Sequence, residues 1–184
     1  MHRPGSERDQ PGPDHRETGM TRGRRTTSSV LPRPAGRGDA FEQWPEDVEF
    51  GVLRELMGYA LRRAQIAIYE DFFATVADLD ITPPMFSSMV LIRNNPGLSQ
   101  SRLGRVVGIA RSGTMALVDR LERAGYVERR PTPGDRRVNQ LALTPHGEEV
   151  LDELIRRIRA HDDRVSARLS EAEKVTLRDL LARF

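Results

Sequence analysis

The chain has 184 residues, no cysteine and a formal net charge of +2 at pH 7. Without cysteine it cannot form disulfides, thiolate-ligated metal sites or a cysteine-based redox sensor. Because it has no run of about 18 apolar residues, and its first residues lack the apolar core of a secretion signal, we expect a cytoplasmic protein without a membrane span.

The small net charge hides a basic middle segment. Residues 82–144 carry 10 basic and 4 acidic side chains, whereas residues 47–81 carry 3 basic and 7 acidic ones. A basic segment beside acidic flanks is typical of a surface that binds a polyanion. A solvated arginine-rich surface would give the same counts, so charge alone leaves both interpretations open.

The first 46 residues differ in composition from the rest. They hold 6 of the 12 prolines and 6 of the 15 glycines, with few large apolar side chains. Such a segment buries too little apolar surface to offset the entropy lost on ordering. We therefore predict a disordered tail over 1–46 and one folded domain over 47–184.

Residues 47–80 contain no proline and repeat apolar residues at helical spacing. The pattern predicts one helix of about thirty residues with two apolar faces. One face should pack on its own domain and the other on something else. The two faces are Leu53, Met57, Ala60, Ala64 and Ile68, and Val52, Leu56, Tyr59, Ile66 and Phe73.

A helix-turn-helix unit is predicted next. After a helix that starts at Thr82, two short helices over Ser99–Val107 and Ala110–Ala124 are separated by Gly108. In such a unit the start of the second helix reaches base edges, although an ordinary helical hairpin has the same pattern. The predicted DNA contacts here are Ser99, Ser101, Arg111, Ser112, Gly113, Thr114, Met115 and Arg120.

A β-hairpin should follow, with strands over Tyr126–Arg130 and Val138–Leu143 and a turn at Pro133-Gly134. Directly after a recognition helix, a hairpin of this kind is a wing. Arginines past its turn can enter a narrow minor groove, whose negative potential attracts guanidinium groups. We assign Arg136 and Arg137 to that groove.

Other wing residues are expected to contact phosphates or to orient arginines. Arg129, Arg130 and Asn139 are predicted phosphate contacts. Asp135 is predicted to pair with Arg120 or Arg136, and Asp119 to hold Arg137. The competing interpretation is a surface hairpin without a nucleic-acid partner. Two more helices should follow, from His146 to about Leu169 and from Ser170 to the end.

The stretch PGLSQSRLGRVVGIARSGTMALVDRLERAGYVERRPTPGDRRVNQLALTPHG, from Pro96 to Gly147, resembles the MarR family of winged-helix regulators. Its most specific parts are LVDRLE (Leu117 to Glu122) and DRR (Asp135 to Arg137). Gly113 is a departure, because the family more often has a larger polar residue there. The resemblance extends in layout over 48–184 and not to the tail.

The resemblance implies a mainly α fold, with a winged helix-turn-helix at about 82–144 between dimerisation helices at about 47–80 and 145–184. It also implies a homodimer that binds double-stranded DNA at a pseudo-palindromic operator, with repression as the commoner outcome. The alternative function is a winged-helix protein-interaction module without specific DNA binding, which would lack salt-dependent affinity for duplex DNA.

The resemblance further implies regulation by a small molecule. Aromatic walls and guanidinium groups suit an aromatic acid or its CoA thioester. Alternatively, the aromatic residues belong to the core and the arginines pair with Glu55, Glu70 or Asp71. The candidate effector residues are Tyr59, Arg62, Arg63, Tyr69, Phe73, Phe86 and Met89.

An enzyme is not expected, because the four histidines are scattered and no GxSxG, phosphate-loop or HExxH motif is present. We predict no cofactor and no metal. The nearest alternative is a metal site formed within a dimer by His146, His161, Asp162 and Asp163.

Overall fold

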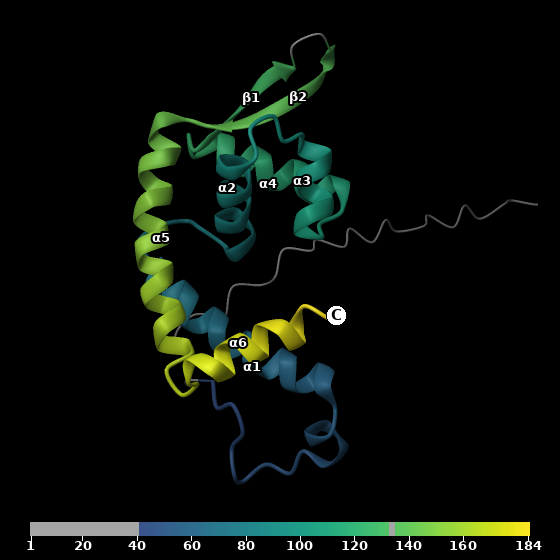
Figure 1. The fold of residues 1–184 in the computed structure, drawn as a ribbon, viewed down its shortest axis with the longest axis vertical. Helices are drawn as coiled ribbons and strands as arrows, with labels where there is room; N and C mark the ends of the chain where they lie inside the picture. Colours follow the sequence, from purple (N-terminus) through teal and green to yellow (C-terminus); the bar gives the residue numbers. More distant parts are fainter. Residues whose placement is uncertain (1–40, 133–134) are drawn as a thin grey trace, which may run out of the picture.

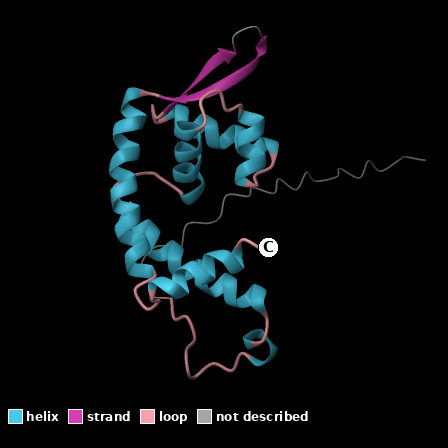
Figure 2. Ribbon diagram, in the orientation of Figure 1, coloured by secondary structure: helices cyan, strands magenta, loops and turns pink. Residues whose placement is uncertain are grey.

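The computed structural model describes residues 41–132 and 135–184, without the side chains of 132–138. Helices dominate, and the two strands of one hairpin form the sheet of this part of the chain (Figure 2). The elements in chain order are η1 (Gly51–Arg54), α1 (Met57–Thr75), α2 (Pro83–Asn94), α3 (Gln100–Val107), α4 (Arg111–Arg123), β1 (Val127–Thr132), β2 (Asp135–Leu143), α5 (Pro145–Val165) and α6 (Glu171–Leu181).

Figure 1 shows two parts joined by one long helix. A lobe contains α2, α3, α4 and the hairpin, and a base contains α1 and α6. Helix α5 runs from the hairpin, along the lobe, to the base, so it connects the predicted DNA-binding and dimerisation parts. The predicted mainly α, winged helix-turn-helix fold is confirmed.

Side-chain caps explain where several helices begin. The Ser99 hydroxyl accepts from the Arg102 amide at 3.3 Å, and the Thr144 hydroxyl accepts from the Gly147 amide at 2.9 Å. These caps satisfy amides that have no partner within the helix. Gly108 ends α3 with a φ of 74°, a conformation that costs glycine little. The predicted helix-turn-helix spacing follows from these local signals.

The predicted single helix over 47–80 is wrong at both ends, because α1 spans only Met57–Thr75 and turns follow it. Leu56 is extended, with φ −88° and ψ 115°, so α1 starts only at Met57. Before α1, the ring of Phe50 lies edge-on to that of Trp44, with centroids 5.1 Å apart. The Phe50 centroid also lies 6.2 Å from that of Tyr59 in α1. These aromatic contacts fold the preceding segment back onto α1 and override the local helical pattern.

The same contacts place residues 41–46 against the folded domain, whereas the predicted tail extends to 46. The Arg63 guanidinium lies 4.3 Å from the Phe41 ring centroid and donates to the main-chain oxygen of Gln43 at 2.9 Å. The rest of the predicted tail, 1–40, lies outside the described residues.

The core lies mostly within the lobe and along α5. Leu103 of α3 and Val118 and Leu121 of α4 are fully buried. The other buried apolar residues are Phe72, Val76, Ile81, Met85, Met89, Ile92, Val127, Leu141, Leu143, Leu151 and Leu154.

The hairpin is anchored to the helix-turn-helix at one end. Strands β1 and β2 are antiparallel, with Val127 opposite Leu143 and Arg129 opposite Leu141. The Leu141 amide donates to the Leu98 oxygen at 2.9 Å, just before α3. This bond fixes the base of the wing beside the start of α3.

The base carries large apolar side chains that this chain leaves exposed. They come from η1, α1, α5, α6 and their flanking residues, and they include Leu53, Met57 and Ile68 of one predicted apolar face and Val52 and Leu56 of the other. The exposed set at the base is Val48, Val52, Leu53, Leu56, Met57, Ile68, Val165, Val175, Leu177, Leu180, Leu181 and Phe184.

A polar cluster joins α5 to α1. The buried His161 has its Nδ1 atom 2.7 Å from Asp71 Oδ1, and Arg164 donates to the same carboxylate at 2.7 Å and to the Thr75 hydroxyl at 2.6 Å. The hydrogen bonds from Arg164 and His161 lower the pKa of Asp71 from 3.8 to about 2.

We predict that Asp71→Asn removes an acid-sensitive contribution to stability. The folded pKa lies below the unfolded value, so this contribution is complete above about pH 4 and is lost as the pH falls through about 2. For a carboxylate one third exposed, it should amount to about 1 kcal/mol after solvent screening.

Urea unfolding of the parent and Asp71→Asn at fixed protein concentration should show a smaller difference at pH 3 than at pH 6. Glu149→Gln on the exposed side of α5 is the control and should show no such change. A difference that is independent of pH would contradict the prediction.

Candidate nucleic-acid interface

Helix α4 has three faces with different surroundings, because residues three and four apart share a side of a helix. Thr114, Val118 and Leu121 are buried. Arg111, Met115 and Asp119 line an open cavity of about 760 Å³, together with α3 and the wing. The third face lines a smaller cavity against α2. It consists of Gly113, Ala116, Leu117, Arg120 and Arg123.

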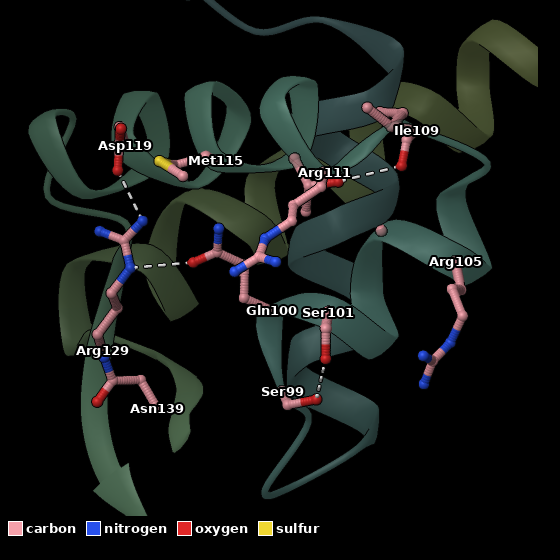
Figure 3. A pocket seen from close by; sticks show the side chains of 12 residues that line it. Ser99, Gln100, Ser101, Arg105, Ile109, Arg111, Met115, Asp119, Arg129 and Asn139 are labelled. Atoms are coloured by element: carbon pink, nitrogen blue, oxygen red, sulfur yellow. Dashed lines mark hydrogen bonds and ion pairs between the residues drawn. The ribbon is translucent and has the colours of Figure 1, made fainter. Parts of the chain in front are cut away.

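The open cavity unites residues from α3, α4 and the wing (Figure 3). Arg111 and Met115 are exposed on its α4 side, with Met115 48% exposed. A concave surface that combines guanidinium, hydroxyl and amide groups can donate to base edges and phosphates. Its lining is Ser99, Gln100, Ser101, Gly104, Arg105, Ile109, Arg111, Thr114, Met115, Asp119, Arg129 and Asn139.

The predicted contacts Ser99, Ser101, Arg111 and Met115 therefore lie together with Asn139 of the wing. Ser112 and Arg130 are exposed nearby on α4 and β1, and Arg130 donates to Glu128 at 2.8 Å. The side chains of Asp135, Arg136 and Arg137 lie outside the described residues, so their assignments stay predictions.

Arg129 is held within the protein instead of facing outward as a free phosphate contact. Its Nη2 atom lies 2.6 Å from Asp119 Oδ1, and its Nε donates to Gln100 at 3.2 Å. Glu122 binds both its Nη1 atom and its main-chain amide. Asp119 is thus an orienting acid for Arg129, whereas its predicted pairing with Arg137 lies outside the described residues. The cluster joins β1 to α3 and α4.

The predicted exposure of Thr114 is wrong. Its side chain is 3% exposed and donates to the main-chain oxygens of Ile109 at 3.2 Å and Ala110 at 3.1 Å. Three residues beyond Arg111, it turns to the core side of α4, where it packs on Gly104 of α3.

Gly113 and Arg120 also lie away from the DNA-facing side. Gly113 lines the small cavity, so its missing side chain opens that cavity and not a path to DNA. Arg120 pairs with Asp80, with Nη2 2.5 Å from Oδ1, while its predicted pairing with Asp135 lies outside the described residues. Both residues lie on a different side of α4 from Arg111 and Met115, so they do not line the open cavity.

Two further residues of the open cavity, Gln100 and Arg105, were not among the predicted contacts. Arg105 is exposed four residues after Ser101, on the same side of α3. That helical spacing was the available signal for Arg105. Gln100 gave no signal, because its role depends on contact with Arg129 of the distant strand β1.

The small cavity holds about 230 Å³ and has mostly apolar walls. Of the predicted effector residues, Phe73 lines it. Its full lining is Phe73, Thr82, Pro83, Pro84, Met85, Ile109, Gly113, Ala116, Leu117, Arg120 and Arg123.

The remaining candidate effector residues lie elsewhere. Tyr59 and Arg63 of α1 pack in the aromatic cluster with Trp44 and Phe50, and Arg62 donates to Gln65 at 3.1 Å. Met89, predicted to line the effector site, is fully buried in the core and does not line this cavity. Tyr69 lies edge-on to Phe73 at 6.3 Å, and Phe86 packs against the core.

Two of the residues in the alternative metal site have other partners. His161 is paired with Asp71, and the His146 ring lies 5.5 Å from that of Tyr126. Among the described residues, no group of three or more His, Asp or Glu side chains could hold a metal ion. The described helices also include none that is long and apolar enough to cross a membrane.

A helix-turn-helix followed directly by a hairpin, with an exposed arginine at the start of the second helix, defines a winged helix-turn-helix protein. Residues 79–138 match the model of the MarR family. A relative from Thauera aromatica, named as a transcriptional regulatory protein for the hcr operon, is 39% identical over 129 residues, covering 70% of this chain and 78% of the relative.

Two solved structures of the transcriptional repressor CouR share the fold. One is bound to a 23-mer DNA duplex, with a TM-score of 0.71 and 36% identity over 74% of this chain and 97% of CouR. The other is bound to p-coumaroyl-CoA, with a TM-score of 0.68 and 34% identity over 74% and 96%. The chain belongs to the MarR family of transcriptional regulators.

We predict that Gly104→Ala disrupts the helix-turn-helix. An added Cβ would lie 2.4 Å from Thr114 Oγ1 and 3.2 Å from its Cβ and Cγ2, so α3 and α4 must separate. Overpacking of this kind costs about 1–3 kcal/mol. Thermal unfolding should show the loss.

Thr114→Ala should rescue part of that loss in the double variant, because it removes two of the three close atoms. Gly58→Ala is the control, since a Cβ there meets nothing within 4 Å. If the costs of Gly104→Ala and Thr114→Ala simply add, the contact between them does not set the helix spacing.

Proposed function

We propose that a homodimer of this chain represses transcription by binding a pseudo-palindromic operator, and that an aromatic acid or its CoA thioester releases it. The observation that carries the proposal is the open cavity on α3, α4 and the wing, which gathers exposed Arg105, Arg111 and Met115. CouR, 36% identical, has been solved on a DNA duplex. The protein acts by binding alone, in the cytoplasm.

Within the operator complex, each part of the surface has a distinct task. Arg111, Ser112 and Met115 read base edges from the start of α4, where a guanidinium can bind guanine through two hydrogen bonds. The residues around the rim contact phosphates and set the register. These are Ser99, Ser101, Arg105, Arg130 and Asn139, with Arg136 and Arg137 at the wing tip.

The exposed apolar residues of the base support dimerisation. Exposed apolar side chains gathered on one part of a protein mark an interaction site, and here they come from η1, α1, α5, α6 and their flanking residues. A second copy of the same surface would cover it through a two-fold axis. The two α4 helices must then lie about 34–36 Å apart to enter successive major grooves.

The small cavity is the proposed effector site. Its 230 Å³ suits one aromatic ring, and Phe73, Pro84, Met85 and Leu117 supply apolar walls. Arg120 provides a polar group for the acyl end. CouR has been solved with p-coumaroyl-CoA, whose aryl group is of this size. The CoA part of such a ligand must extend outside a cavity this small.

Effector and operator would be coupled because they use opposite sides of α4. Ala116 and Leu117 line the effector cavity, and Met115 lines the open cavity. A ligand that prefers an altered position of α4 weakens operator binding by its difference in affinity for the two states.

We predict that Arg111→Ala weakens binding to an operator selected from a random duplex pool by about 1–3 kcal/mol and relaxes preference at one base pair. Arg130→Ala should weaken binding to all sequences and lower the salt slope by about 1. Fluorescence anisotropy at several salt concentrations measures both effects.

Arg156→Ala on α5, with an equally charged and exposed side chain, is the control and should leave operator affinity unchanged. Wild-type affinity in Arg111→Ala would overturn the assignment of the recognition surface. Salt-independent affinity in the parent would favour a protein-interaction module.

We predict that Ala116→Leu fills the effector cavity and removes the response to p-coumaroyl-CoA. The operator complex should form as in the parent but persist when the ligand is added. Ala116→Ser, which adds little volume, is the control and should respond as the parent does. If Ala116→Leu dissociates from the operator at the same ligand concentration as the parent, the effector binds elsewhere.

A further inference from the structure

The ion pair between Arg120 and Asp80 ties the recognition helix to the loop between α1 and α2. Arg120 Nη2 lies 2.5 Å from Asp80 Oδ1 and donates to the Asp80 main-chain oxygen at 3.3 Å. The Arg120 side chain is 32% exposed and that of Asp80 is 71% exposed. One guanidinium nitrogen thus contacts both the carboxylate and the backbone of the loop.

Arg120 lies at the boundary of two cavities. It lines the apolar cavity proposed for the effector, and it also lines a neighbouring cavity of about 270 Å³ that contains Asp80. Arg123 lines both cavities as well, and its Nε donates to the main-chain oxygen of Asp119 at 3.2 Å. The arginine available to the effector's acyl end is therefore already bound by an acid of the protein.

The loop that carries Asp80 is held at a second point. Arg157 of α5 donates to Asp78 Oδ1 at 2.7 Å and to Glu153 at 2.7 Å. The hydrogen bond from Arg157 holds the pKa of the Asp78 carboxyl below its usual value, so this link remains charged at neutral pH. Asp80 is thus kept beside Arg120 from the α5 side.

We propose that Asp80 is a specificity-determining residue that disfavours free aromatic acids and favours their thioesters in the apolar cavity. The inference rests on the proposed effector site. A free carboxylate that binds Arg120 must either displace Asp80 or lie beside it as a like charge, and both cost free energy. A thioester carbonyl is neutral and accepts a hydrogen bond from Arg120 while the ion pair stays intact.

Calorimetric titration with p-coumarate and p-coumaroyl-CoA tests this assignment. In Asp80→Asn, p-coumarate should bind about three- to five-fold more tightly, the range expected from one exposed ion pair, while p-coumaroyl-CoA binding stays unchanged. Asp80→Glu, which keeps the charge, should retain most of the parent's preference for the thioester.

Asp152→Asn is the matched control. Asp152 is 72% exposed and pairs with Arg93 at 2.6 Å, away from the apolar cavity, so its loss should leave the ratio of the two affinities unchanged. An unchanged ratio in Asp80→Asn, or equal tightening for both ligands, overturns the role of Asp80 alone. A parent protein that binds neither ligand overturns the effector site as well.

Discussion

The close contact between Gly104 of α3 and Thr114 of α4 is the constraint on which the DNA-binding lobe depends. Because Gly104 has no side chain, the buried Thr114 packs directly on α3. The Thr114 hydroxyl donates to the main-chain oxygen of Ala110, at the start of its own helix. The distance and angle between the two helices follow from this contact. Because interiors are close-packed, a change here moves the whole recognition helix and not one side chain.

In this position, α4 contributes residues to the core, to the open cavity and to the proposed effector cavity. A helix turns about 100° per residue, so neighbouring positions such as Thr114, Met115 and Ala116 serve different tasks. The Arg129 cluster continues this arrangement into the wing, since Asp119 and Glu122 of α4 hold β1 in place. The open cavity is therefore lined by three elements that are bonded to one another, and a ligand in the proposed effector cavity beside α4 would act on all of them.

Local sequence signals predicted the helix-turn-helix, the hairpin and their order, because caps, glycines and apolar spacing act within a few residues of the chain. They failed where distant contacts decide. The helix predicted over 47–80 loses its start to the aromatic cluster around Phe50. Arg129 looked like a phosphate contact, but its acids lie on another element. The proposed effector cavity includes Phe73 of the predicted effector set, together with Gly113 and Arg120, which had been predicted to contact DNA.

The sequence by itself determined the class of the protein, since the segment from Pro96 to Gly147 combines a helix-turn-helix, a wing and the family's specific motifs. Only the tertiary structure decided which side each α4 residue faces and which arginines are already paired. The physical reason is the separation along the chain of the residues that interact. Helix starts and turns are set by neighbours in the chain, whereas Arg120–Asp80 and Arg129–Asp119 join residues that only folding brings within hydrogen-bond distance.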